Sequence, residues 1–325
     1  MIFPRLLRNN FLLFIAIAFA TTAYGKSIKD QQDGVTLKMN TIEIEVGAEK
    51  EFSILHISDS HLAFADERND ERKVELSAKR TKIFGNSYAV IEAQRNFAKE
   101  NDLTIVHTGD LIDFVSEANI EYAAKLFSEG EWIVCAGNHE YSLYVGEARE
   151  DAAYRAQSYD KIQKVYPNDL TFYSRVVNGV NFVTLDNGYY KFSKEQFAKM
   201  KQEVKKGLPI IMVCHNPIYT PDLCDYSLKK AKGKAAGLVG VPRKITDTYA
   251  HKPYPTGEEW RNRSVQQRAD RTTLKFVQWL KKQEELKAIL CGHCHFYYKT
   301  QFSQTATQYT TGAGYKHLGY IIKIK

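Results

Sequence analysis

Five short apolar runs, each followed at once by residues that can bind a metal, constrain the fold of this 325-residue chain more than any other feature. The runs are rich in β-branched or aromatic residues and too short for helices, so they predict buried strands. In open α/β sheets, ligands bind beyond the carboxyl ends of the strands. The side chains that follow the runs should therefore meet at one rim. The runs are Phe52 to Ile57, Leu103 to Val106, Trp132 to Val134, Ile210 to Val213 and Ala288 to Leu290.

Segments with helical spacing separate these strands, for example around Ile91 and around Val277. Strands that alternate with helices favour sheets covered by helices. Two further strand pairs are expected: Phe172–Val177 with Val180–Leu185, and Gln308–Thr311 with Tyr320–Ile324. An Asn-Gly turn joins the first pair, which is a strong hairpin signal. The predicted fold class is α/β, a four-layer α-β-β-α sandwich of two mixed sheets with flanking helices.

The first 25 residues resemble a secretory signal peptide. Arg5 and Arg8 precede the apolar run Phe11 to Ala20, and small residues follow it. The alternative is an uncleaved membrane anchor, but the run has about half of the roughly 20 residues that a spanning helix needs. We therefore expect residues 1–25 to be removed, residues 26–325 to form one domain without a membrane span, and the protein to be secreted or periplasmic.

Composition adds few constraints on function. Removing Arg5 and Arg8 lowers the formal charge from +7 to +5, which gives no general case for a stable nucleic-acid partner. The five cysteines are odd in number and not dense, so no disulfide framework is indicated. Cys135, Cys214 and Cys291 end apolar runs and are expected to be small buried hydrophobes.

The residues after the strands combine carboxylates, an amide and imidazoles. A single histidine after a strand is usually a hydrogen-bonded loop residue, but the joint placement of so many favours a metal site. Alternate residues of an extended segment point the same way, so Asp59 and His61 should share a side, as should His293 and His295. The full set is Asp59, His61, Asp110, Asp113, Asn138, His139, His215, His293 and His295.

Mixed oxygen and nitrogen ligands suit Zn, Mn or Fe, whereas Ca or Mg would take mostly oxygen. The candidates are also too numerous for one tetrahedral site. Asp110 is the obvious carboxylate to bridge two ions, and the set suffices for a pair at the roughly 3.5–4 Å spacing of two-metal hydrolysis.

These blocks, in this order, resemble the calcineurin-like metallophosphoesterases. They are Asp59-Ser60-His61, Gly109-Asp110-Leu111-Ile112-Asp113, Gly137-Asn138-His139-Glu140, His215 and Gly292-His293-Cys294-His295, and the resemblance extends from about Glu51 to the C-terminus. It implies hydrolysis of a small phosphate mono- or diester by a hydroxide that bridges two metal ions. It also implies roles for individual residues: Asp59, His61 and His295 on one metal, Asn138, His215 and His293 on the second, Asp110 on both, and His139, oriented by Asp113, beside the ester.

Two departures from related families bear on the substrate. Purple acid phosphatases have a tyrosine where Asp113 stands, so their iron-tyrosinate chromophore is not expected. The arginine of the Ser/Thr protein phosphatase signature is missing, since Phe114 follows Asp113 and Tyr141 follows Glu140. Protein substrates are therefore less favoured than small esters.

Other residues near the motifs have weaker indications. Glu140, His56 and His107 are candidates for supporting the ligands, although packing within a strand is the favoured role of both histidines. His251 and His317 lie in loop-like surroundings. The segment from Leu62 to Phe84 has mixed charges and is expected to be an exposed loop or helix rather than part of a site.

A long insertion, about residues 218–270, separates His215 from His293 and is expected to place a loop over the site. The usual interpretation of its basic run is a solvated loop. The functional interpretation is a lid that holds an anionic substrate. Its candidate residues are Lys229, Lys230, Lys232, Lys234, Tyr249, Tyr254, Trp260, Arg261 and Arg263.

Two other functions use the same residues. One is a non-catalytic binder that holds a phosphorylated ligand through its metals, and the other is a hydrolase of non-phosphate esters. The pair His139 and Asp113 argues against a pure binder, which has no need for an acid dyad.

Overall fold

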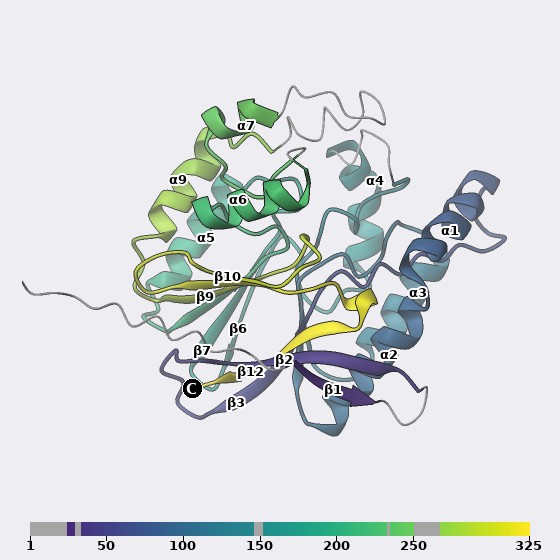
Figure 1. Cartoon of the computed structure of the whole chain (residues 1–325), viewed down its shortest axis with the longest axis horizontal. Coiled ribbons are helices and arrows are strands. Elements are labelled where there is room, and N and C mark those ends of the chain that lie inside the picture. Colours follow the sequence, from purple (N-terminus) through teal and green to yellow (C-terminus); the bar gives the residue numbers. More distant parts are fainter. Residues whose placement is uncertain (1–24, 30–33, 146–151, 233–234, 250–266) are drawn as a thin grey trace, which may run out of the picture.

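Two mixed six-stranded sheets form the centre of the computed structural model, which describes residues 25–29, 34–145, 152–232, 235–249 and 267–325 (Figure 1). The first sheet has the order β1-β2-β12-β3-β4-β5 and comprises Gly25–Lys29, Thr36–Ile44, Leu318–Ile324, Phe52–Ile57, Thr104–His107 and Trp132–Val134. The second has the order β10-β11-β9-β8-β7-β6 and comprises Tyr298–Gln301, Thr307–Thr310, Leu286–Cys291, Ile210–Val213, Val180–Leu185 and Phe172–Val177.

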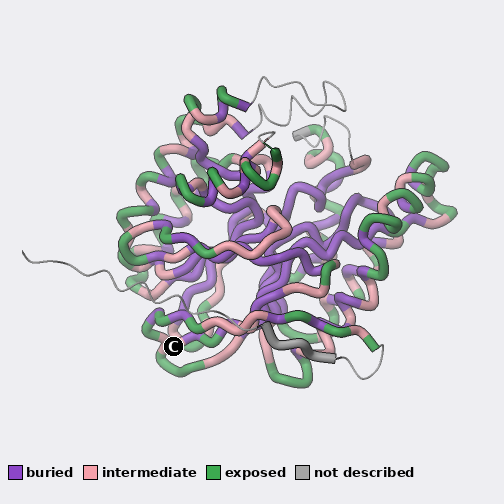
Figure 2. The backbone as a smooth tube through the Cα atoms, in the orientation of Figure 1, coloured by how far each residue is buried: buried purple, intermediate pink, exposed green. Residues whose placement is uncertain are grey.

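The sheets pack face to face through aliphatic side chains. Ile54 and Val106 of the first sheet and Ile211 and Leu290 of the second lie in one buried cluster. In Figure 2 the buried residues are the purple segments of the backbone tube, which gather in the middle of the molecule. The strands of this interior are apolar on both faces, because helices cover the outer face of each sheet.

Helices form the two outer layers (Figure 1). Ile91 of α2 (Ser87–Glu100), Leu126 of α3 (Glu117–Phe127) and Ile162 of α4 (Ala152–Gln163) pack in the outer core of the first sheet. Met200 of α5 (Lys194–Val204) and Phe276 of α9 (Arg271–Leu280) pack in that of the second. The other helices in the described ranges are α1 (Glu71–Phe84), α6 (Pro221–Lys230), α7 (Arg243–Tyr249) and the 3-10 turn η1 (Gly314–Lys316). The four-layer α-β-β-α sandwich predicted from the sequence is confirmed.

The predicted strands are present with small shifts in their ends, as β3, β4, β5, β8 and β9. The predicted hairpin is β6 with β7, paired from Val177 with Val180, and its turn residues Asn178 and Gly179 have φ of 47° and 79°. The left-handed conformation at both positions is the one that an Asn-Gly turn favours.

The second predicted strand pair is wrong. β11 pairs with β9 and β10 in the second sheet, whereas β12 lies between β2 and β3 in the first. The connection therefore crosses from one sheet to the other, and on its way Gly314 and Tyr315 donate backbone hydrogen bonds to Ser58 and Asp59. Adjacency in sequence suggested pairing, but each strand completes a different sheet.

The parallel strands β3, β4 and β5 end at the same edge of their sheet, as β8 and β9 do in theirs. Past its strand, the loop after β3 continues to pair with the loop after β4 through bonds from Asp59 N to Gly109 O and from His61 N to Asp110 O. Hydrogen bonds between the two loops therefore fix the backbone of Asp59 and His61.

Within the described ranges, no helix is long and apolar enough to cross a membrane.

Gly109 allows a close approach between the loops after β4 and β5. Its φ is 89°, and a Cβ there would lie 2.5 Å from the backbone N of Gly137. We expect Gly109→Ala to lower the free energy of unfolding by several kcal/mol, beyond the roughly 1–2 kcal/mol of a left-handed alanine. Gly207→Ala is the matched control, since its φ is 69° and nothing lies within 4 Å of the added Cβ. Equal losses for the two variants in urea unfolding would contradict a rigid contact.

Candidate metal centre

Six of the predicted ligands lie in groups whose ligand atoms are all within 4.8 Å of one another. Asp59, His61 and His295 form one group, and Asp110, His215 and His293 form another. A third group joins His61, Asp110 and His139. Asp59 and His61 follow β3, Asp110 follows β4, His215 follows β8, and the last two histidines follow β9. The rim that the strand pattern predicts is therefore where these side chains converge.

The group of Asp59, His61 and His295 is arranged around facing nitrogen atoms. His61 Nε2 and His295 Nε2 are 3.2 Å apart, and His295 Nε2 is 3.1 Å from Asp59 Oδ1. The other oxygen, Asp59 Oδ2, accepts the backbone N–H of His293. Two imidazoles and a carboxylate thus point at one small volume.

The second group repeats this arrangement. His293 Nδ1 lies 3.2 Å from His215 Nε2, which in turn lies 3.1 Å from Asp110 Oδ2. The same Asp110 Oδ2 is 3.9 Å from His61 Nε2, an atom of the first group. Asp110 is therefore placed between the two groups, as a bridging carboxylate would be.

Asn138, the predicted amide ligand, is buried in the loop after β5. The residues on either side of it are fixed by their amides: Gly137 N donates to Glu140 Oε2 and His139 N donates to Asp110 Oδ1. This loop is thereby tied to the carboxylate between the two groups.

The backbone at the candidate ligands is left-handed rather than extended. Asp59, His61, His293 and His295 have φ of 53°, 49°, 65° and 56°, and Asp110 has 55°. The expectation that Asp59 and His61 share a side because their segment is extended was therefore wrong in its reason. The two side chains nevertheless belong to one group, and both residues adopt an uncommon conformation that costs free energy in residues with a Cβ and is concentrated at functional sites.

The protonation states of the site residues decide which of them can ligate a metal ion directly. Burial opposes ionisation of Asp110, yet His215 and His139 hold the pKa of its carboxyl well below the usual range. Burial, together with His215, lowers the pKa of His293 to about 3. Burial also lowers the pKa of His215, but Asp110 reverses this and raises it to about 9. Asp110 is thus ionised and His293 neutral at pH 7, while His215 must release its proton before it can ligate.

The predicted dyad of His139 and Asp113 is formed. His139 Nδ1 lies 2.8 Å from the Asp113 carbonyl oxygen and 3.1 Å from Asp113 Oδ1. Since Nδ1 is held by Asp113, the other nitrogen, Nε2, is the atom through which the ring can act on a substrate.

The expectation that the segment from Leu62 to Phe84 lies outside the site was wrong. Arg80 of α1 donates from Nε and Nη2 to the two oxygens of Asp113, at 2.6 and 2.8 Å. Phe84 stacks on the His61 ring, with centroids 4.4 Å apart and planes 3° apart. The sequence carries a signal for this face, since Ser77, Arg80 and Phe84 follow helical spacing, but the mixed charges of the segment obscured it.

Two tyrosines next to the ligands also escaped the sequence analysis. Tyr190 OH lies 2.9 Å from His293 Nε2, and Tyr315 OH lies 3.5 Å from His295 Nδ1. Each contacts the ring nitrogen that faces away from its ligand group, which is the usual place for a group that orients a ligating histidine. Neither tyrosine belongs to a motif, and only the tertiary structure brings them to the site.

Glu140 supports the ligands through the backbone rather than through their rings. Its carboxylate accepts the N–H groups of Asp110, Leu111 and Gly137 at 2.8, 2.7 and 2.6 Å, and the hydroxyl of Tyr166 at 3.2 Å. Burial and the nearby Asp110 raise the pKa of Glu140 to about 7.

The remaining histidines have structural surroundings. His56 in β3 contacts Thr108 Oγ1 and His107 in β4 contacts Ser60 Oγ, both at 3.0 Å. His317 Nδ1 contacts the carbonyl oxygen of Thr36. The cysteines predicted to be buried are buried: Cys135, Cys214 and Cys291.

The insertion forms a cap with its own small core instead of a simple loop. Leu223 of α6, Leu238 and Tyr249 of α7 pack together with Cys294, which lies between two candidate ligands. Tyr249 was a candidate for holding a substrate in the lid interpretation, but it is 1% exposed and belongs to this core. Lys229, Lys230 and Lys232 are exposed. The other candidates of the insertion, Lys234, His251, Tyr254, Trp260, Arg261 and Arg263, lie outside the described residues.

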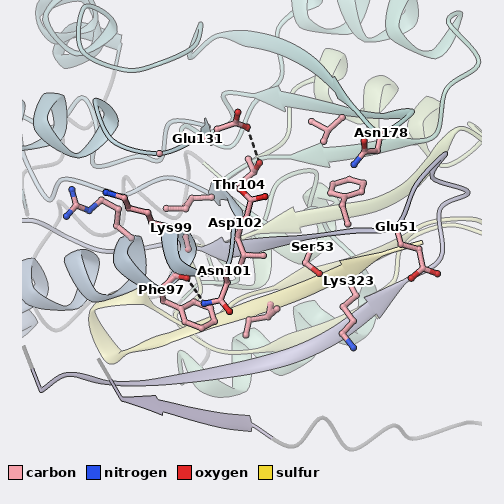
Figure 3. Close-up of a pocket in the computed structure, with 18 of the residues that line it drawn as sticks. Glu51, Ser53, Phe97, Lys99, Asn101, Asp102, Thr104, Glu131, Asn178 and Lys323 are labelled. Carbon is pink, nitrogen blue, oxygen red and sulfur yellow. Dashed lines mark hydrogen bonds between the residues drawn. The ribbon is translucent and has the colours of Figure 1, made fainter. Parts of the chain in front are cut away.

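A cavity of about 1010 Å³ lies at the opposite ends of the strands (Figure 3). It is lined by residues at the beginnings of β3 and β4, including Ser53 and Thr104, and by Glu131 just before β5. None of the candidate ligands is among its lining residues in the described part of the chain. The candidate ligands therefore lie at the rim formed by the carboxyl ends of the strands and not in this hollow.

A family model described as calcineurin-like phosphoesterase matches residues 52–297. The chain belongs to this family. The match includes every motif block, from Asp59 to His295, and so confirms the family resemblance of the sequence.

Solved structures similar to this phosphoesterase include a dimetal phosphatase from Danio rerio, at 13% identity and a TM-score of 0.42, covering 81% of this chain and 88% of that one. A putative 5'-nucleotidase from Staphylococcus aureus matches at 12% identity and a TM-score of 0.39, covering 82% of this chain and 49% of that one. At these values the similarity carries no inference about substrate. A comparison with curated proteins finds no match.

The contacts of Glu140 generate a prediction about stability. We expect Glu140→Gln to lower the free energy of unfolding by about 1–3 kcal/mol, because the new NH2 group would face backbone N–H groups and leave buried donors unsatisfied. Tyr166→Phe is the control, since it removes only the 3.2 Å hydroxyl contact to Glu140. Urea unfolding of both variants measures the difference. A loss for Glu140→Gln no larger than that of Tyr166→Phe would contradict this role.

Proposed function

We propose that this phosphoesterase hydrolyses small phosphate esters with two metal ions. The first ion would be bound by Asp59, His61 and His295, the second by Asn138, His215 and His293, with Asp110 bridging them. The observation that carries this proposal is the convergence of two separate carboxylate and imidazole groups on either side of Asp110 Oδ2.

The residues present fit such a pair of ions. Two imidazole nitrogens face each other at 3.2 Å in each group, where at most one proton can lie between them. In the described part of the chain, the buried Asp59 Oδ1 lacks a hydrogen-bond donor, although His295 Nε2 is only 3.1 Å away. A cation would offset this accumulation of lone pairs. The mixed oxygen and nitrogen donors favour Mn, Fe or Zn over Ca or Mg.

When bound, the metal pair supplies Lewis acidity toward the phosphoryl oxygens and lowers the pKa of the attacking water. The chain's own contribution is to position that chemistry and to move a proton. Asp113 holds His139 by Nδ1, so Nε2 would donate its proton to the departing alkoxide as the bond from phosphorus to the leaving oxygen breaks. The products are an alcohol and a phosphate, and His139 then regains its proton from solvent.

The proposed substrate is a small mono- or diester. The cap of α6 and α7 reaches the site, since a Cβ on Gly237 would lie 3.4 Å from the His293 ring. It also carries exposed cations at Lys229 and Lys230, and positive charge is compatible with an anionic ligand. No stable nucleic-acid partner is proposed, because the net charge is modest for a chain of this length.

A single substitution separates metal binding from proton transfer. We expect His139→Ala to retain its metal content while kcat on an alkyl phosphate, whose leaving group needs a proton, falls about 10²–10⁴-fold, the usual range for loss of an acid catalyst. A panel of nitrophenyl phosphate, bis-nitrophenyl phosphate and nitrophenyl acetate would be assayed beside the alkyl ester with added Mn, Zn or Fe, with metal content measured on the same samples. His317→Ala is the control, a histidine whose ring contacts the Thr36 carbonyl instead of the site. Normal turnover by His139→Ala would contradict the role.

The same panel separates the other functions. Hydrolysis of the acetate alone would identify a hydrolase of non-phosphate esters. Tight metal binding without turnover of any ester would identify a binder of phosphorylated ligands. Preference between the two phosphate compounds distinguishes a monoesterase from a diesterase.

We also propose that the chain is exported and that its first 25 residues are removed. Support comes from the arginines and apolar run of that segment, and from β1, which begins at Gly25 and pairs with β2. Cleavage there would leave most of this strand in the domain. N-terminal sequencing of the protein purified from the periplasm or medium of an expressing bacterium should begin near Lys26. A variant that lacks residues 2–24 should remain in the cytoplasm, and full-length cytoplasmic protein that keeps Met1 would contradict export.

A further inference from the structure

Arg80 forms a two-point ion pair with the carboxylate of the dyad. Its Nε donates to Asp113 Oδ2 at 2.6 Å and its Nη2 donates to Asp113 Oδ1 at 2.8 Å. The Asp113 side chain is fully buried and that of Arg80 is 20% exposed. A guanidinium that binds both oxygens fixes the plane of a carboxylate, which a lysine amine cannot do.

The carboxylate that Arg80 holds serves two histidines of the site. Asp113 Oδ1 lies 2.9 Å from His61 Nδ1 and 3.1 Å from His139 Nδ1. His61 is a proposed metal ligand, and His139 is the proposed proton donor. The same oxygen, Asp113 Oδ1, therefore contacts both rings. It orients His61 on the side of the metal ions and His139 on the side of the leaving group.

Helix α1 keeps Arg80 in place. Ser77 and Thr81, on either side of Arg80, donate hydrogen bonds to the carbonyl oxygen of Ala63 in the loop that follows β3. The Arg80 guanidinium also lies 4.8 Å from the centre of the Phe84 ring, which stacks on His61. The arginine is thus part of a packed layer that covers one side of the site.

We propose that Arg80 is a positioning residue, which fixes Asp113 so that one carboxylate orients both His139 and His61. This inference rests on the proposed function. It assigns to α1 a part in the reaction that no motif residue indicates. Removal of Arg80 would take both guanidinium hydrogen bonds from the buried Asp113 carboxylate, and its weaker hold on the two rings would disturb both histidines together.

The test compares three variants on α1. Arg80→Met removes the positive charge and both hydrogen bonds to Asp113, whereas Arg80→Lys keeps the charge but cannot bind both carboxylate oxygens in one plane. Lys79→Met is the control, because it removes an exposed partner of Glu75 at the adjacent position. Each is assayed with nitrophenyl phosphate, whose leaving group departs without a proton, and with an alkyl phosphate, whose leaving group needs one. Metal affinity is measured separately by titration of the metal-free protein with Zn or Mn.

For Arg80→Met we expect kcat on the alkyl ester to fall about 10²-fold. The loss on nitrophenyl phosphate should be smaller, and KM should be nearly unchanged. Affinity for one metal ion should fall about 10-fold or more, as when a group that orients a ligand is lost. Arg80→Lys should be intermediate in both measurements, and Lys79→Met should match the parent protein.

Three results would overturn the inference. A raised KM with equal losses on both esters would show that Arg80 binds the phosphate itself. Equal losses on both esters with unchanged KM and metal affinity would reduce the ion pair to a structural role. Unchanged metal affinity in Arg80→Met would remove the link to His61. If the parent protein hydrolyses neither ester, the proposed function fails, and the metal titration still decides whether Arg80 orients His61.

Discussion

The geometry of the site depends on the hydrogen bonds that the Glu140 carboxylate accepts from backbone N–H groups. This carboxylate accepts backbone N–H groups from Gly137 and from Asp110 and Leu111, and so joins the loop after β5 to the loop after β4. The two loops approach so closely that neither Gly109 nor Gly137 has room for a Cβ. Burying a carboxylate is costly unless it is hydrogen-bonded, and the three amide bonds offset that cost. Asp110 and Asn138 are thereby held at a fixed separation.

Around this junction, the fold places buried ionisable side chains and residues with left-handed backbone conformations next to one another. Asp59, Asp110 and Asp113 are buried within reach of the imidazoles of His61, His215 and His139. Left-handed backbone at Asp59 and His61 is maintained because their amides donate to the loop after β4. Strain of this kind persists only where surrounding bonds determine it. Metal ions that bind the folded state and not the unfolded chain would add further stability.

Two elements outside the sandwich extend the site. Helix α1 reaches the dyad through Arg80 and covers His61 with Phe84. On the other side, the cap of α6 and α7 packs on Cys294 and brings Gly237 next to His293. The two sheets thus provide the candidate ligands, while α1 and the cap lie against them. Under the proposed function, substrate selection would depend on these two elements, because the motif residues would contact only the reacting phosphate.

The sequence alone determined the reactive groups and the edge of the fold where they meet. Short apolar runs specify buried strands, parallel strands end at a common edge, and the residues after them therefore converge. This reasoning identified the candidate ligands without any interatomic distance from the structure. They are Asp59, His61, Asp110, His215 and both histidines after β9.

Only the tertiary structure decided which other side chains complete the site. Arg80 is 33 positions from Asp113, and Tyr190 is 103 positions from His293, so no local pattern predicts either contact. Packing also moved Tyr249 into a core and placed β11 and β12 in different sheets. Local periodicity reports which face of an element is buried, whereas the partner on that face is set by the packing of the whole chain.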